Sequence, residues 1–277
     1  MTTQAEYQNF QIIKVPGING LGKTDGCERA GNALIETLRE IYTNEQGKEI
    51  SVGKLDLEEI HLDNYNLEES GELIYENAFK SYNKDKVIFL GGDHSISYFL
   101  TRAFFDYNQN EGKEPCLIVF DAHPDLMKPS SEFPTHEEWL RKLIEDGFPV
   151  ENILLVGIRN SDKEEIKFIM ENKIKFISMN SFLLNLEDIC DGIMEFSNGK
   201  ELYLSLDIDV VDPAFAPSTG YLETGGLTSR QIIYLMQRIS KIKNLRAIDI
   251  VEIDSEKDKK NNNLTVKLGA KILSEFL

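Results

Sequence analysis

Short apolar runs of strand length recur along the chain, and segments with the spacing of amphipathic helices separate most of them. The runs predict strands at residues 10–15, 87–90, 117–120, 153–156, 175–178, 202–206 and 247–253. Helices are predicted where apolar residues share one helical face: Ala30, Leu34, Ile35 and Leu38; Ile232, Leu235, Met236 and Ile239; and, near the C-terminus, Leu264, Leu268, Ile272 and Leu273.

Strands that alternate with helices predict an α/β fold in which a mainly parallel sheet lies between two layers of helices. The strand runs are almost continuously apolar, as is typical of strands covered on both faces. No stretch is rich enough in Pro, Gly or Ser to divide the chain, so residues 1–277 are expected to form a single domain. The most polar stretch, residues 257–263, is expected to be a surface loop before the last helix.

The charge balance narrows the possible partners. Asp and Glu number 47 against 30 Lys and Arg, which gives a net charge of -17. This negative field repels phosphate backbones and anionic membranes, so neither nucleic acid nor a membrane is expected as a partner. It attracts metal ions and guanidinium or ammonium substrates, although a role in solubility accounts for the surplus equally well.

The cysteines and the N-terminal residues bear on location. Cys27, Cys116 and Cys190 are odd in number, far apart and without a CxxC pair, which argues against a disulfide framework and fits a reducing cytoplasm. Residues 1–10 lack the basic and then apolar pattern of a signal peptide, and no apolar stretch approaches the length of a membrane span. We therefore expect a soluble, cytoplasmic protein.

Three acidic segments each follow a predicted strand: Gly-Gly-Asp-His-Ser at 91–95, Asp-Ala-His-Pro-Asp at 121–125 and Asp-Ile-Asp at 207–209. Open α/β sheets place their ligand sites at the carboxyl ends of the strands, and neighbouring strands there lie about 4.8 Å apart. Side chains two residues apart along a strand point the same way, so Asp207 and Asp209 are expected to lie together. The same parity joins Asp121, His123 and Asp125.

Apart from Asp93, these segments supply two imidazoles and four carboxylates, a donor set that suits divalent ions such as manganese. The six residues are His94, Asp121, His123, Asp125, Asp207 and Asp209. Four carboxylates also balance the charge of two divalent cations. Taken alone, each segment has an ordinary explanation as a helix cap or a turn. Their common position at strand ends favours a pair of metal ions and metal-assisted hydrolysis.

These segments resemble the three sequence blocks of the ureohydrolase family of arginases, agmatinases and formiminoglutamases. The third block continues to Asp212-Pro213, Ala216-Pro217-x-Thr219-Gly220 and Gly225-Gly226-Leu227-Thr228, and Gly26-Cys27-Glu28-x-Ala30 resembles the family's N-terminal element. The resemblance implies an arginase-like fold and two Mn²⁺ ions per subunit. It assigns His94, Asp121, Asp125 and Asp207 to one ion and His123, Asp121, Asp207 and Asp209 to the other, with Asp121 and Asp207 bridging.

The resemblance also implies a reaction. A hydroxide between the ions attacks the carbon of a guanidinium or similar amidine, and urea and an amine are released. Asp125 is expected to orient the hydroxide, Glu252 to bind the guanidinium and His136 to shuttle a proton. Glu252 can instead be a surface residue at a strand end. His136 can instead belong to a helix start, because Thr135 and Glu138 have capping-box spacing. His61 lies outside every motif and is expected at the surface.

The chain departs from the family at the substrate contacts. Met127 stands where arginases carry an Asn that binds the amino-acid end of arginine, and Tyr221 replaces a Thr close to the guanidinium. Asp162 matches an arginase Asp that meets the α-amino group, although it can equally cap a helix or contact another cation. Arginine is therefore disfavoured as the substrate.

A small cationic guanidino substrate is expected, with agmatine, guanidinobutyrate and guanidine all open. The alternatives are a formiminoglutamase-type hydrolase that releases formamide, an arginase, and a metal-binding regulatory relative without turnover. Relatives assemble as trimers or hexamers, so a homo-oligomer is expected by resemblance alone.

Overall fold

The computed structural model describes residues 10–183 and 185–277, and its strands join one sheet. The sheet has eight strands in the order β2-β1-β3-β8-β7-β4-β5-β6, and every neighbouring pair is parallel. The strands are β1 Phe10–Lys14, β2 Asp56–Glu59, β3 Lys86–Leu90, β4 Pro115–Phe120, β5 Ile153–Ile158, β6 Lys175–Ser178, β7 Glu201–Asp207 and β8 Leu245–Val251. Seven of them coincide with the predicted runs, so the predicted parallel α/β sheet is confirmed.

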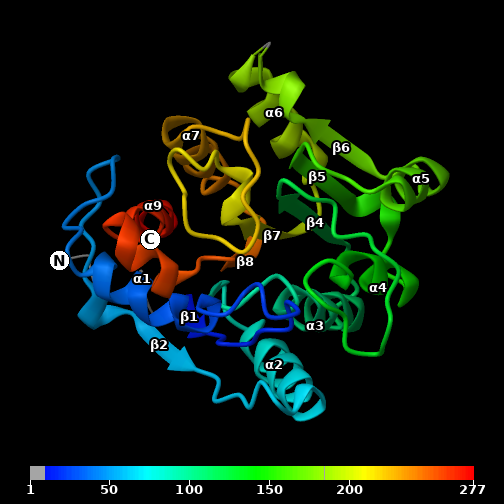
Figure 1. Ribbon diagram of the computed structural model, residues 1–277, viewed down its shortest axis with the longest axis horizontal. Helices are drawn as coiled ribbons and strands as arrows, with labels where there is room; N and C mark the ends of the chain where they lie inside the picture. Colours follow the sequence, from blue (N-terminus) through cyan, green and yellow to red (C-terminus); the bar gives the residue numbers. More distant parts are fainter. Residues whose placement is uncertain (1–9, 184) are drawn as a thin grey trace.

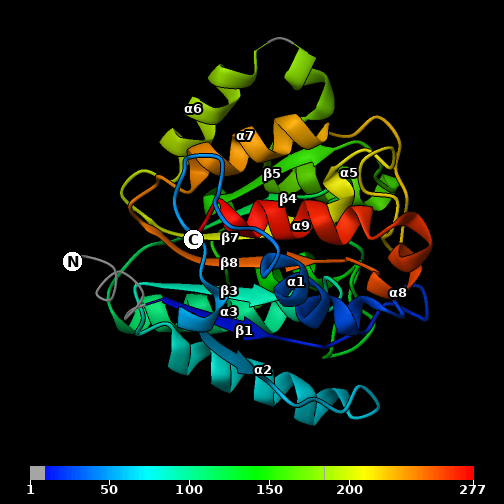
Figure 2. The same cartoon turned by 90° about the vertical axis from the view of Figure 1, so that its left-hand side faces the viewer.

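Helices cover both faces of the sheet, as Figure 1 shows for α1, α7 and α9 on one face and α2, α3 and α4 on the other. The helices are α1 Ala30–Leu38, α2 Leu67–Ser81, α3 Ile96–Asn110, α4 Trp139–Glu145, α5 Lys163–Asn172, α6 Leu186–Phe196, α7 Ser229–Ile239, α8 Ser255–Asp258 and α9 Leu264–Ser274. In Figure 2, α2 and α6 lie at opposite ends of the molecule.

Strand residues alternate between two apolar cores. Ile12 and Ile88 pack in the core beneath α1, α6, α7 and α9, whereas Ile13 and Phe89 pack in the core beneath α2 to α5. This period-two alternation is what a pleated strand covered on both sides requires. The predicted faces of α1, α7 and α9 are buried in the first of these cores, which confirms those three helices.

Two features differ from the predictions. Strand β2 was not predicted, because its sequence Asp-Leu-Glu-Glu is exposed at the sheet edge and carries no apolar run. Residues 257–263 are mostly exposed and precede the last helix, as predicted, but they are not an irregular loop, since α8 ends at Asp258 and a 3-10 turn follows at Lys259–Asn261. Asp258 is buried and accepts a hydrogen bond from the Val266 N–H at 2.8 Å, which joins this polar segment to α9.

The remaining expectations concern exposure. His61 is exposed, as predicted. Cys27, Cys116 and Cys190 are buried and free. Within the residues that the structure describes, no helix has both the length and the apolar character needed to cross a membrane.

The turn after β3 depends on two glycines. Gly91 and Gly92 have φ angles of 90° and 82°, a left-handed backbone that side chains disfavour. A Cβ on Gly92 would lie 2.5 Å from the Gly17 carbonyl oxygen. The chain after β3 therefore packs directly against the segment after β1, and this contact fixes where the following residues, including His94, emerge.

Replacing Gly92 by Ala is expected to lower the free energy of unfolding, because it adds a steric overlap to backbone strain. Gly47→Ala is the matched control: Gly47 also has a φ of 82°, but a Cβ there would meet nothing within 4 Å. In urea unfolding, the Gly92 variant should lose about 1–3 kcal/mol more than the control. Equal losses would contradict the close approach described here.

Candidate metal centre

The carboxyl ends of adjacent strands bring the six predicted ligands together. His94 follows β3, Asp121, His123 and Asp125 follow β4, and Asp207 ends β7. Asp209 lies in the 3-10 turn that follows β7, at Ile208–Val210. Strands β3, β8, β7 and β4 are consecutive in the sheet, so segments more than 80 residues apart in sequence meet at the carboxyl ends of these strands.

The ligand atoms form two groups that share Asp121. His94, Asp121 and Asp207 form one group, and Asp121, His123 and Asp209 form the other; within each group the atoms lie within 4.8 Å of one another. Asp121 turns Oδ2 to His94 Nδ1 at 2.9 Å and Oδ1 to His123 Nδ1 at 3.6 Å. One carboxylate thus faces both imidazoles, which is the geometry that a bridging ligand requires.

The remaining distances place the other carboxylates around these imidazoles. Asp125 Oδ2 lies 3.0 Å from His94 Nδ1, and Asp207 Oδ2 lies 3.3 Å from it. Asp209 Oδ2 lies 2.9 Å from His123 Nδ1. The other oxygen of Asp207, Oδ1, accepts a hydrogen bond from the backbone N–H of Asp209 at 2.7 Å. Asp207 thus contacts His94 directly and is linked to the second group through the backbone of Asp209.

The electrostatics fit a cation-binding site. Burial and then the charge of Asp121 raise the pKa of Asp125 to about 7. Burial and then the charges of Asp209 and Asp121 raise the pKa of Asp207 well above its usual value. His94 Nδ1 and Asp121 Oδ2 are buried and have no hydrogen-bond partner among the described residues. Bound divalent cations would satisfy these atoms and offset the repulsion.

Two residues of the site hold a strained backbone. Asp125 has a φ of 52° and Glu252 a φ of 64°, a region that residues other than glycine rarely adopt. Glu165 Oε1 accepts a hydrogen bond from the Leu126 N–H at 2.9 Å, next to Asp125. The Glu252 N–H donates to the Gly92 carbonyl at 3.0 Å. These contacts hold both carboxylates in the orientation that faces the site.

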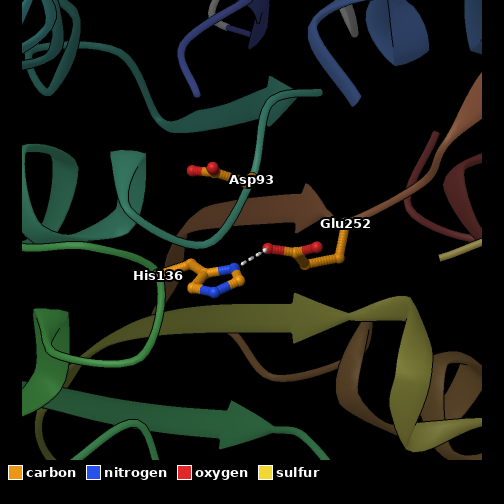
Figure 3. A group of neighbouring side chains, drawn as sticks. All are labelled: Asp93, His136 and Glu252. Carbon is orange, nitrogen blue, oxygen red and sulfur yellow. Dashed lines mark ion pairs between the residues drawn. The ribbon is translucent and has the colours of Figure 1, made fainter. Parts of the chain in front are cut away.

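Glu252 and His136 line the same cavity as the candidate ligands. Figure 3 shows these two side chains facing each other, with Asp93 nearby. Glu252 Oε1 accepts a hydrogen bond from the backbone N–H of His94 at 2.9 Å and lies 3.4 Å from His136 Nδ1. Burial disfavours a charged His136, but the hydrogen bond to Glu252 and its charge outweigh this effect and raise the pKa of His136 to about 9. Glu252 is 4% exposed, so it is not a surface residue at a strand end.

Asp93 completes a third acidic group but is already occupied. Its Oδ2 accepts from the Asn19 N–H at 2.6 Å and from Thr24 Oγ1 at 2.8 Å, and its Oδ1 accepts from the Ser95 N–H at 3.0 Å. These contacts join Asp93 to the segment after β1. Asp93 is therefore a structural anchor rather than a ligand.

The structure gives the segment around His136 only one of the two hydrogen bonds of the predicted capping box. The Thr135 N–H donates to Glu138 Oε2 at 3.0 Å, and α4 begins directly after Glu138. The ring of His136 nevertheless faces Glu252. Glu138, not Thr135, is the N-cap of α4, and no side chain caps this helix, so the predicted cap by Thr135 is wrong.

A cavity of about 390 Å³ opens onto the metal groups. Besides those ligands, its walls include His136, Glu252, Met127, Tyr221 and Asp162. The Tyr221 ring centroid lies 5.5 Å from that of His136 and 6.2 Å from that of His123, so the phenol lies directly beside the site. Asp162 Oδ1 accepts the Glu164 N–H at 2.8 Å in a capping box of α5, which confirms the helix-capping interpretation.

A comparison with known protein families shows the family of this chain. The sequence model of the protein family described as "Arginase family" matches residues 8–277. The chain belongs to the arginase family. Its members are hydrolases that act on amidino C–N bonds, and this protein is a hydrolase of that class.

Individual relatives in this family differ in substrate. An arginase of Staphylococcus aureus (strain MRSA252) is 28% identical, with 97% of each chain covered. An agmatinase of Bacillus subtilis is 31% identical over 68% of this chain and 61% of its own. An N(1)-aminopropylagmatine ureohydrolase of Thermus thermophilus is 31% identical over 67% of this chain and 61% of its own.

Solved structures share the fold. Proclavaminate amidino hydrolase from Streptomyces clavuligerus gives a TM-score of 0.85 at 22% identity and covers 97% of this chain and 90% of its own. Formimidoylglutamase from Bacillus subtilis gives a TM-score of 0.82 at 21% identity and covers 96% and 85%. The arginase-like fold expected from the resemblance is therefore confirmed.

Sequence reasoning missed several residues of this arginase-family site. Trp139 Nε1 donates to Asp125 Oδ2 at 2.7 Å, although nothing but its place after the second block marks this only Trp in the sequence. Arg159 Nη2 donates to the carbonyl oxygens of Asp209 at 2.6 Å and Glu223 at 2.8 Å. This guanidinium joins the loop that carries Tyr221 and Glu223 to the 3-10 turn that carries Asp209.

Replacing Asp121 by Asn is expected to remove nearly all bound Mn²⁺, because the lost charge faces both groups. Asp209→Asn should remove about half, since Asp209 belongs to one group alone. Inductively coupled plasma mass spectrometry after Mn²⁺ loading and desalting measures the content. Equal losses in the two variants would contradict the shared position of Asp121.

Proposed function

We propose that this protein is a binuclear manganese amidinohydrolase that releases urea from a small guanidino compound carrying a second positive charge. Agmatine represents this class. The observation that supports the proposal most is that Asp121 faces both imidazoles while Glu252 lines the same cavity. One cavity thus has a candidate site for two cations and a carboxylate that would bind the guanidinium.

The residues divide between two ions. His94, Asp121, Asp125 and Asp207 would hold one, and His123, Asp121, Asp207 and Asp209 the other. Imidazole and carboxylate ligands suit Mn²⁺. When bound, the ion pair supplies the positive charge that ionises water near neutral pH.

Three side chains would act on the substrate and the attacking water. Glu252 pairs its carboxylate with the planar guanidinium, a charge-assisted contact with fixed geometry. Asp125, held by Trp139, orients the attacking oxygen by hydrogen bonding. His136 keeps a proton at neutral pH because Glu252 stabilises its charged form, and it delivers that proton to the departing amine.

The acidic residues that line the cavity favour a cationic substrate end. Glu137, Asp162 and Glu165 line it, and among its described lining residues none is Lys or Arg. A substrate carboxylate would meet like charge there without a counterion, whereas an ammonium group would meet opposite charge. Met127 offers no hydrogen bond to the amino-acid end of arginine. Tyr221 narrows the space beside the metal groups.

The test compares agmatine with 4-guanidinobutyrate, which have similar chain lengths but end in an amine and a carboxylate. Urea release by the Mn²⁺-loaded protein should give a kcat/KM for agmatine at least about tenfold higher, equivalent to 1.4 kcal/mol. Arginine, guanidine and formiminoglutamate extend the panel, with EDTA-treated protein as the control.

Other outcomes separate the alternatives. A preference for 4-guanidinobutyrate or arginine would refute the proposed role of the acidic walls. Formamide release from formiminoglutamate without urea from any guanidine would identify a formiminoglutamase-type enzyme. Retention of Mn²⁺ without turnover of any compound would support a regulatory relative.

Glu252→Gln is expected to lower kcat/KM about 10- to 100-fold, because a hydrogen bond to a charged group contributes about 1.5–3 kcal/mol. The amide oxygen of Gln can still accept a hydrogen bond from the backbone N–H of His94, so the Mn²⁺ content should stay unchanged. Steady-state kinetics and metal analysis on the same preparation measure both. A parallel loss of metal would show that Glu252 acts on the metal centre rather than on the guanidinium.

The organisation of the protein is also a proposal. All described strands join one sheet, which supports a single domain over residues 1–277. The family resemblance supports a homo-oligomer, and the three free cysteines support a cytoplasmic location. Sedimentation velocity measures the oligomeric state.

A further inference from the structure

Another carboxylate, outside the proposed metal centre, is buried within the sheet. Asp249 on β8 is 0% exposed and lies in a strand that is otherwise largely apolar. Oδ2 accepts from Ser97 Oγ and from Tyr203 Oη, both at 2.8 Å. Oδ1 accepts from Ser205 Oγ at 2.7 Å and from the Leu206 N–H at 3.3 Å. Donors from α3, β7 and the backbone thus surround one buried acid.

This arrangement favours an ionised Asp249. Burial raises its pKa, but the hydrogen bonds from Ser205, Ser97 and Tyr203 oppose that rise. A protonated acid would give up one of these acceptor positions. Four donors directed at two oxygens are the partners that a buried charge requires.

The ionised carboxylate fixes the direction of the Ser205 hydroxyl. Ser205 has one hydroxyl proton, and it is donated to Asp249 Oδ1. Ser205 Oγ also lies 2.9 Å from His94 Nε2, and there it can only accept. His94 must therefore carry its proton on Nε2. Its other nitrogen, Nδ1, then presents a lone pair to the buried space shared with Asp121, Asp125 and Asp207.

We propose that Asp249 is a positioning residue that, through Ser205, fixes the tautomer of His94 and so strengthens binding of the metal ion beside it. The inference rests on the proposed metal centre, but not on the identity of the substrate. Carboxylate partners of metal-bound histidines generally act in this way, and their loss costs about 10- to 100-fold in metal affinity. Here the carboxylate acts across an intervening hydroxyl.

The chain gives the two histidines unequal support. His123 Nε2 lies 3.6 Å from Glu223 Oε1, with no hydroxyl between them, and the His123 side chain is 23% exposed. The His94 side chain is 1% exposed and is held by the Ser205–Asp249 relay. Loss of the relay should therefore weaken one ion and spare the other.

The test uses the two oxygens of Asp249 as its internal comparison. Asp249→Ala and Ser205→Ala break the relay at Oδ1, whereas Ser97→Ala and Tyr203→Phe remove donors to Oδ2 alone. Each Mn²⁺-loaded variant is equilibrated with graded EDTA, and retained Mn²⁺ per chain is measured. The relay variants should release about one of their two ions at a roughly 10- to 100-fold lower free EDTA concentration than the unmodified protein. The Oδ2 variants should match the unmodified protein within about threefold.

The double variant Asp249→Ala/Ser205→Ala should behave like either single variant, because both changes interrupt one hydrogen-bond chain. Thermal unfolding of each metal-free variant provides the folding control. Ser205→Ala removes a single oxygen atom and keeps the test informative if Asp249→Ala fails to fold.

Equal Mn²⁺ retention by the relay variants and the Oδ2 variants would overturn the proposal. So would loss of both ions together from the relay variants. The readout is Mn²⁺ retention, so a protein that holds Mn²⁺ but releases no urea would refute the proposed activity while the relay result stands. A protein that retains no Mn²⁺ in its unmodified form would overturn both.

Discussion

Mutual repulsion of buried carboxylates is the constraint on which this structure depends. Asp121, Asp125, Asp207 and Asp209 are each at most 7% exposed and lie at one edge of the sheet. Burial and neighbouring negative charge raise the pKa of Asp125 and of Asp207. Such a cluster destabilises the folded protein unless protonation or bound cations offset the repulsion. His94 Nδ1 and Asp121 Oδ2, which are buried without a hydrogen-bond partner among the described residues, lie where a cation would bind.

The scaffold satisfies this constraint through local rigidity. Gly91 and Gly92 let the chain after β3 pass against neighbouring backbone, and the strained residues Asp125 and Glu252 are held by hydrogen bonds to other segments. The parallel sheet then brings the loops after β3, β4, β7 and β8 to the same edge. Tyr221 lines the same cavity but lies outside the charge cluster.

The sequence predicted those parts of the molecule whose signal is local. Apolar runs located seven strands, and motifs at strand ends located the acidic and histidine residues that the sheet brings together, because parallel strands end on the same side. The exposed strand β2 has no apolar run, and the turn at Lys259–Asn261 is stabilised by a buried Asp258 that contacts α9. Neither feature is visible without tertiary contacts.

The partners of the ligands could not be predicted either. The contact between His136 and Glu252 joins positions more than 100 residues apart, and the hydrogen bond from Trp139 to Asp125 depends on how α4 packs. Asp249 did carry a local signal, as a charged residue within an apolar strand run. Its partners Ser97 and Tyr203 come from two other elements, so its role required the structure.

Anomalous X-ray diffraction from crystals grown with Mn²⁺ tests the central claim most directly. The account predicts two anomalous peaks about 3.5–4 Å apart, one beside His94 and one beside His123, with Asp121 in contact with both. A single peak, or peaks that do not contact Asp121, would contradict it.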